Sequence, residues 1–168
     1  MAFADFVARI VSPDLRRVAV HWNEARGGRC MPAWQDLKPA AIAPQLPLVW
    51  SYRYDAAGDD FVGRLAGDVI ARIFGQGFKG VRMSALQPKI DVSFLMARSR
   101  RVIRGPALFR SDGDVFHQPD RHGYGERIIM PLSDGGGMAD GVFGATHYQT
   151  SHQRRGGVLI EDWFALTA

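Results

Sequence analysis

The sequence predicts an α+β fold: a five-stranded antiparallel sheet with short helices and one long helix on one face, plus N-terminal helices. Three observations lead to this prediction. Two short alternating segments joined by a turn lie between residues 48 and 65, helical segments follow up to residue 104, and three further alternating segments come after them. Strands joined by short turns pair antiparallel, so we expect an antiparallel sheet. We also expect the helices to lie over only one side of this sheet.

Composition limits the class of protein. With 168 residues the chain fits one domain, so we expect a single globular unit. The single cysteine, Cys30, excludes an internal disulfide and any cysteine-based metal cage. No leader pattern and no bilayer-length apolar run are found, so we expect a cytoplasmic protein without membrane insertion. A net charge of +4 is modest, and we expect no nucleic-acid partner.

The region 1–47 is predicted to be an N-terminal helical extension packed on the core. Apolar residues between 3 and 11 share one helical stripe, and Ser12 and Pro13 are a typical cap and first-turn residue for a second helix. Gly27 ends it, and four prolines then prevent a long helix. Phe3, Phe6 and Ile10 have two interpretations: packing on the core, or a dimer contact.

The first hairpin is predicted from two alternating segments. Trp50, Tyr52 and Tyr54 share one face of a strand that starts near Leu48, residues 55–58 form a turn, and the second strand runs from Phe61 to Leu65. Asp68 is a suitable cap for a short helix, 68–74, which Gly75 can end in a left-handed conformation. The residues 48–152 would form the central domain.

A longer amphipathic helix is predicted for residues 88–104, with apolar residues on one side and arginines on the other. The remaining strands are predicted at 107–112, 127–134 and 141–150, with a polar loop between the first two of these. Pro131 interrupts its strand, so it should lie at an edge or a bulge. Residues 153–168 are left as a C-terminal segment.

Several spaced blocks resemble a known family. `ARGGRCMPAWQDLKP`, `LPLVWSYRY`, `FVGRLAGDVIARIFGQGFKG` and `ERIIMPLSDGGG` are similar to the PAS_5 family, a bacterial, mostly alphaproteobacterial group of single-domain PAS proteins. The resemblance covers nearly the whole chain and implies a PAS-like fold with a role in signal transduction. The sequence departs from the family pattern at Asp68, where threonine is typical, and at Trp34, where arginine is frequent.

In such a layout, a small ligand would bind between the sheet and the helices 68–74 and 88–104, and would order the short helices. The candidate ligand-binding residues are Phe61, Arg64, Leu65, Phe74, Met83, Leu95, Met96, Phe109, Met130, Phe143 and His147. The apolar members of this set are equally suited to a filled core. Arg64 has two interpretations as well: a cross-strand pair with an acid such as Asp55, or an anchor for an anionic ligand.

Metal, haem and flavin are each weighed against the residues present. His117 and His122 lie in a polar loop with acidic neighbours, which allows a divalent ion, although a solvated loop is the commoner arrangement. Haem-binding PAS domains usually present a histidine from the long helix, and the segment 88–104 has none, so haem is not expected. Cys30 precedes the first strand, so covalent flavin chemistry is not expected either.

The arginines at 98, 100, 101 and 104 are interpreted as a solvated helix face, with a binding face for an acidic partner, a nucleotide or phosphate as the alternative. No pattern of nucleophilic catalysis is found, so we expect no enzyme. The favoured function is a sensory or regulatory domain that binds a small ligand, a protein partner or a second copy of itself. The alternatives are a dimerisation or adaptor module with a filled core, and a small metal-dependent enzyme that uses the loop histidines.

Overall fold

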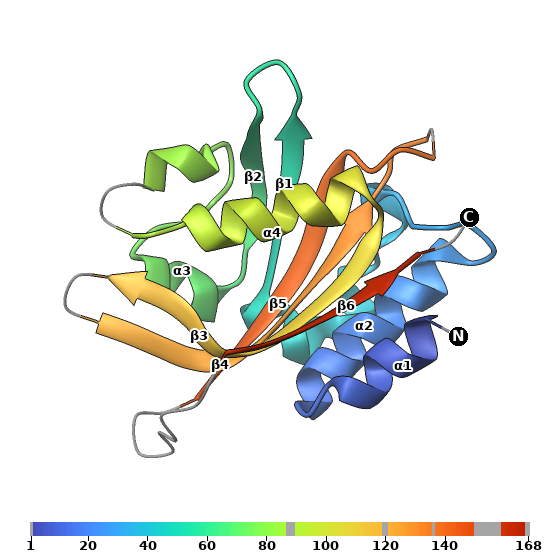
Figure 1. The fold of residues 1–168 in the computed structure, drawn as a ribbon, viewed down its shortest axis with the longest axis horizontal. Coiled ribbons are helices and arrows are strands. Elements are labelled where there is room, and N and C mark those ends of the chain that lie inside the picture. The colour runs from blue at the N-terminus through green and yellow to red at the C-terminus, as the bar shows by residue number, and fades with distance from the viewer. Residues whose placement is uncertain (1, 87–89, 119–120, 136, 150–158, 167–168) are drawn as a thin grey trace.

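A computed structural model describes residues 2–86, 90–118, 121–135, 137–149 and 159–166. Its sheet has six antiparallel strands in the order β2-β1-β5-β4-β3-β6 (Figure 1). The strands are β1 (Val49–Asp55), β2 (Asp60–Ala66), β3 (Ala107–Gln118), β4 (Arg121–Leu132), β5 (Gly141–Gln149) and β6 (Ile160–Ala165). The prediction of an antiparallel sheet is confirmed, but the prediction of five strands is wrong. The sixth strand lies in the segment that the sequence left without structure, and it pairs with β3 at one edge.

Helices cover both faces of the sheet, so the expectation of a single covered face is wrong. The helices are α1 (Ala2–Arg9), α2 (Pro13–Arg26), η1 (Trp34–Asp36), η2 (Pro39–Leu48), α3 (Asp68–Phe74), η3 (Met83–Leu86) and α4 (Ser93–Arg104). We call the side of α3 and α4 the α4 face and the side of α1 and α2 the N-terminal face (Figure 1). None of the described helices is long and apolar enough to cross a membrane.

Two apolar clusters result from this arrangement, one on each face. Strand alternation divides neighbouring residues between them: Ile129 belongs to the cluster on the α4 face, while Ile128 and Met130 belong to the cluster on the N-terminal face. Both clusters contain fully buried side chains, so the sheet is the middle layer of three rather than one wall of two.

The N-terminal face holds a network of buried charges. Ser12 caps α2 by accepting a hydrogen bond from the Leu15 amide. The amides of Val11 and Ser12 donate to the carboxylate of Glu126 on β4, and Arg110 on β3 donates its Nε to the same carboxylate at 2.7 Å. This network ties the start of α2 to the sheet.

The first two helices therefore belong to the core. Phe6 and Ile10 have no exposed surface, and Phe3 stacks against Trp22. The interpretation of Phe3, Phe6 and Ile10 as a dimer contact is wrong, because the sheet itself supplies the apolar surface that they cover. Pro131 lies beyond the last residue of β4 that pairs with β3, and its carbonyl accepts a hydrogen bond from the Trp22 indole.

Local signals set several element boundaries. Gly27 ends α2 and Gly75 ends α3, both with positive φ, as predicted. Asp68 is the first residue of α3 rather than its cap, because Gly67 occupies the cap position. Glycine is needed there, since a Cβ at residue 67 would lie 2.1 Å from the Leu46 carbonyl oxygen. The helix α4 begins at Ser93, later than predicted.

The segment between β3 and β4 was predicted as a loop, and this is wrong. Both strands continue through it, and the backbones of residues 117 and 122 pair across the hairpin. The hairpin projects beyond the rest of the sheet (Figure 1). Polar residues in this segment hid the strand signal, because such an extension has little core to face.

Candidate functional site

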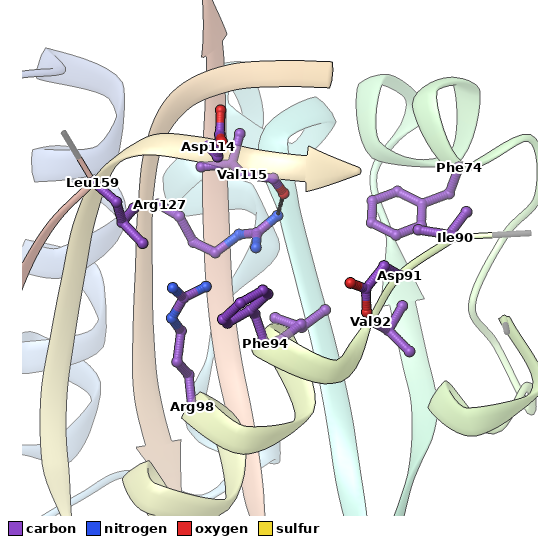
Figure 2. Close-up of a pocket in the computed structure, with 11 residues that line it drawn as sticks. Phe74, Ile90, Asp91, Val92, Phe94, Arg98, Asp114, Val115, Arg127 and Leu159 are labelled. Carbon is purple, nitrogen blue, oxygen red and sulfur yellow. Dashed lines mark hydrogen bonds between the residues drawn. The ribbon is translucent and has the colours of Figure 1, made fainter. Parts of the chain in front are cut away.

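A cavity of about 200 Å³ opens on the α4 face, between the first turns of α4, the end of α3 and the strands β3 and β4. Its walls combine apolar groups with four charged side chains, which Figure 2 shows as sticks. The lining residues are Phe74, Ile90, Asp91, Val92, Phe94, Leu95, Arg98, Asp114, Val115, Arg127 and Leu159. Leu159 comes just before β6, so the residue that leads into this strand also helps to form the cavity.

Arg127 is the most buried charge in this cavity, with 4% of its surface exposed. It lies on β4 in phase with Ile129, so its side chain points to the α4 face. Its Nε donates to the Thr146 hydroxyl at 3.1 Å and its Nη2 donates to the Val115 carbonyl. Among the described residues it has no carboxylate partner, which is unusual for a buried guanidinium.

Burial lowers the pKa of Arg127, and the nearby positive charge of Arg98 lowers it further, while Tyr148 and Tyr52 oppose this. Burial also raises the pKa values of Tyr52 and Tyr148, so both phenols stay neutral. Their hydroxyl oxygens are buried and have no hydrogen-bond partner of good geometry among the described residues. The two phenols near Arg127 therefore supply no negative charge.

Arg98 enters the same cavity from α4 and is also buried (Figure 2). Its guanidinium is held between the rings of Phe94 and Phe109, at 5.2 and 5.5 Å from their centroids. It forms an ion pair with Glu161 on β6, to which its Nε donates at 2.7 Å. The placement of Arg98 on a solvated helix face is wrong, whereas Arg101 and Arg104 are exposed as expected.

A second cavity, of about 180 Å³, lies on the N-terminal face between the segment 34–46 and the sheet. Its walls are mostly apolar, and they include Leu65 and Phe143. His21 also lines it and accepts a hydrogen bond from the Lys38 amide through Nε2 at 3.0 Å. No buried guanidinium is among its lining residues.

The structure divides the predicted ligand-binding residues between the two faces. Six of them pack on the α4 face, in or against its apolar cluster: Phe61, Phe74, Met83, Leu95, Met96 and Phe109. Met130 and Phe143 are buried on the N-terminal face, and Leu65 lines the cavity there. His147 is half-buried and follows Phe143 and Ala145 along the same side of β5. Of the eleven predicted residues, Phe74 and Leu95 line the α4 cavity directly.

Arg64 lies at a bulge of β2, where the register against β1 shifts. Its Nη2 donates to Asp134 at 3.3 Å, and its guanidinium lies 5.3 Å from the centroid of the Trp34 ring. Arg64 thus pairs with an acid, as one interpretation expected, but the acid is Asp134 rather than a cross-strand residue such as Asp55, which pairs with Arg82 at 2.8 Å. Burial lowers the pKa of Arg64, although Asp134 and Asp140 oppose this.

Sequence reasoning missed Arg127 as a site residue and misplaced Arg98. The signals for both were present. Arg98 follows Leu95 by three residues and precedes Val102 by four, which puts it on the buried stripe of α4. Arg127 shares strand parity with Ile129. What the sequence does not contain is the identity of their partners, because Glu161 and Thr146 come from other strands.

The residues considered for metal and thiol chemistry contribute little to this cavity. The described part of the chain contains no group of three or more side chains suited to a metal ion. The side chains of His117 and His122 lie outside the described set, as does His152. Cys30 is partly buried and packs against the cluster on the N-terminal face, away from the cavity on the α4 face.

Comparison with known proteins supports one family. The family model PAS_5, described as a PAS domain, matches residues 10–147. No curated protein matches the chain. Three solved structures of VqmA are similar, each with a TM-score of 0.44, at 16, 17 and 16% identity. They cover 73, 67 and 65% of this chain, and this chain covers 59, 57 and 49% of theirs.

The three VqmA structures differ in what they contain. One is a Vibrio cholerae VqmA dimer without target DNA, discussed as a LuxR-type receptor, one is VqmA bound to DPO, and one is a complex of VqmA with ligand and DNA. The exclusion of a nucleic-acid partner from the sequence is wrong as it stands, because a protein with similarity to this chain binds DNA. The modest net charge was too weak a reason to exclude that class of partner.

Proposed function

The chain belongs to the PAS_5 family of PAS domains, and from this premise we propose that it is a non-catalytic sensory domain that binds a small molecule in the cavity on the α4 face. The observation that carries the proposal is the cavity itself, whose walls combine apolar side chains with two buried guanidinium groups. Cavities with a mostly apolar lining and a few convergent polar groups are typical of small-molecule sites.

The elements around the cavity suit a sensor. In the described part of the segment between α3 and α4, the helical element is the short η3, and α4 meets the sheet through side chains that also line the cavity. A ligand there would contact α4 and the residue that precedes β6 at the same time. Binding would therefore stabilise one arrangement of α4 against β6, and this change would be passed on to other parts of the protein or to a partner.

A cavity-filling variant tests the proposal. Val115 lines the cavity from β3 and is buried, so Val115→Phe should fill part of the space that a ligand needs. Val20→Phe is the matched control, because Val20 lies on α2 with 37% of its surface exposed. We expect native mass spectrometry and a thermal-shift screen of metabolites to find ligands that bind the parent and the control but not Val115→Phe.

Circular dichroism of each variant shows whether the fold is kept. The proposal is contradicted if freshly purified parent protein carries no bound mass and no metabolite raises its melting temperature. It is equally contradicted if Val115→Phe, correctly folded, binds every ligand as the parent does, because the molecule would then sit elsewhere.

A further inference from the structure

The buried guanidinium of Arg127 in the cavity on the α4 face indicates the chemical class of its ligand. Resting on the function proposed above, we propose that the ligand is a small monocarboxylate with an apolar body, whose carboxylate pairs with Arg127 and also contacts Arg98. The argument uses the charge balance of the cavity, the free donor positions of Arg127 and the nature of the walls.

Charge balance comes first. Arg98 is already neutralised by Glu161, which reaches it from β6. Arg127 donates to a hydroxyl and a carbonyl, and the nearby Tyr148 phenol is neutral, so this buried positive charge has no ion-pair partner among the described residues. A buried charge without a partner is costly, and an anion that enters the cavity would remove this cost.

The geometry of Arg127 also favours an anion. Its Nε and Nη2 are used by Thr146 and Val115, while Nη1 makes no described hydrogen bond, and the side chain lines the cavity. Figure 2 shows the guanidinium groups of Arg98 and Arg127 directed into the same space from α4 and β4. A carboxylate between them would accept hydrogen bonds from both, which is the arrangement that guanidinium groups support best.

Two further carboxylates line the cavity, Asp91 and Asp114. Asp91 accepts hydrogen bonds from the amide and hydroxyl of Ser93 at the start of α4. The carboxylate of Asp114 points away from the two guanidinium groups (Figure 2). In Figure 2 both carboxylates lie apart from the guanidinium of Arg127, so neither occupies the place that we assign to the ligand's carboxylate.

The walls and the size of the cavity restrict the rest of the ligand. Phe74, Ile90, Val92, Leu95 and Val115 provide apolar surface for a hydrocarbon body. The cavity of about 200 Å³ is smaller than the roughly 300–1,000 Å³ of sites that hold drug-sized molecules. A single uncompensated cation matches one negative charge, so a monocarboxylate fits better than a phosphate dianion, which carries more charge and needs more donors.

The test compares acids with their own amides. Butyrate and benzoate are added to the purified full chain, and butyramide and benzamide serve as isosteric neutral probes at the same millimolar concentration and ionic strength. We expect at least one of the two carboxylates to raise the melting temperature and to show a binding isotherm by calorimetry, with its amide much weaker. Inorganic phosphate, the anion without an apolar body, should give no shift beyond that of sodium chloride.

Variants locate the effect. Arg127→Met should weaken carboxylate binding by roughly 10- to 100-fold, the range for losing a charged hydrogen bond, while Arg53→Met, an exposed arginine on β1, should not change it. Arg127→Lys keeps the charge without the planar fork and should recover part of the affinity, which keeps the test informative if the methionine variant folds poorly. Arg98→Gln should weaken binding as well, but less than Arg127→Met.

The outcomes separate this inference from the proposed function. If amides bind as tightly as acids and Val115→Phe abolishes both, the cavity is a ligand site but the carboxylate assignment is overturned. The assignment is also overturned if neither acid binds, if phosphate binds as well as the acids, or if Arg127→Met binds the acids as the parent does.

Discussion

Arg110 and Arg127 lie on neighbouring strands of one sheet and point to opposite faces, and their surroundings differ in one respect. Arg110, on the N-terminal face, meets the carboxylates of Glu126, Asp112 and Asp162 at 2.7 to 3.3 Å. Arg127, on the α4 face, forms no ion pair with a described carboxylate and lines a cavity. Both are almost fully buried. The comparison teaches that charge balance, rather than burial, separates an arginine that holds the fold from one that is available to a ligand.

The largest effect is expected for Arg110→Met. This change leaves Glu126, itself 3% exposed, with only backbone partners at the start of α2, and removal of one member of a buried ion pair costs about 3–5 kcal/mol. Urea unfolding followed by circular dichroism measures the free energy of unfolding, with Arg53→Met as the exposed control. A loss below about 1 kcal/mol would show that the Arg110 network contributes no more than a surface pair.

A smaller loss is expected for Glu161→Gln. Arg98 would lose its counter-charge, but the side chain of Glu161 is 31% exposed, so solvent screens part of the interaction and the expected loss is about 1–2 kcal/mol. The same unfolding experiment measures it. Because the cavity would then contain two unbalanced cations, carboxylate binding should become tighter; a weaker affinity would contradict the assignment of the positive charge.

For Arg127→Met we expect a free energy of unfolding equal to that of the parent, or higher by about 1 kcal/mol, when no ligand is present. The variant removes an uncompensated buried charge and supplies an apolar side chain of similar length. This sign is opposite to that for Arg110→Met, and the two are measured side by side by urea unfolding. A loss as large as that of Arg110→Met would end the distinction between the two arginines.

The smallest effect concerns pH and the N-terminal face, where burial lowers the pKa of His21 below its ordinary value of 6.5. The folded protein favours the neutral imidazole, whose Nε2 accepts the Lys38 amide. Its contribution to stability is therefore complete above the ordinary pKa and is lost as the pH falls through the lowered one. Between about pH 7.5 and 5.5, we expect His21→Gln to lose less free energy of unfolding than the parent. The prediction is contradicted if the free energy of unfolding changes with pH equally in His21→Gln and in the parent.

Much of the fold was predictable from local signals. The Trp50–Tyr52 alternation, the cap at Ser12 and the left-handed Gly75 each depend on a few adjacent residues, and the structure has the corresponding elements in those places. The strand β6 was not predictable in this way. Its Glu161 and Asp162 look like exposed charges in the sequence, but strand alternation sends them to opposite faces, where each meets an arginine from a distant element.

The site was less predictable than the fold for the same reason. The parity of Arg127 with Ile129 indicates that the side chain points to the α4 face. That Arg127 forms no ion pair with a described carboxylate depends on how the neighbouring elements pack. The apolar candidates Met130 and Phe143 were assigned to a pocket on the basis of residue type, and type alone does not distinguish the two faces of a sheet that is covered on both. Residue type therefore predicts whether a side chain is buried, but not on which face of the sheet it lies.

A crystal structure of the protein grown with butyrate tests the central claim most directly. We predict a carboxylate in the cavity on the α4 face, within about 3 Å of Arg127 Nη1, with its hydrocarbon chain against Val92, Leu95 and Val115. An empty cavity, or butyrate bound only at the exposed arginines of α4, would contradict the claim that the unbalanced charge of Arg127 selects the ligand.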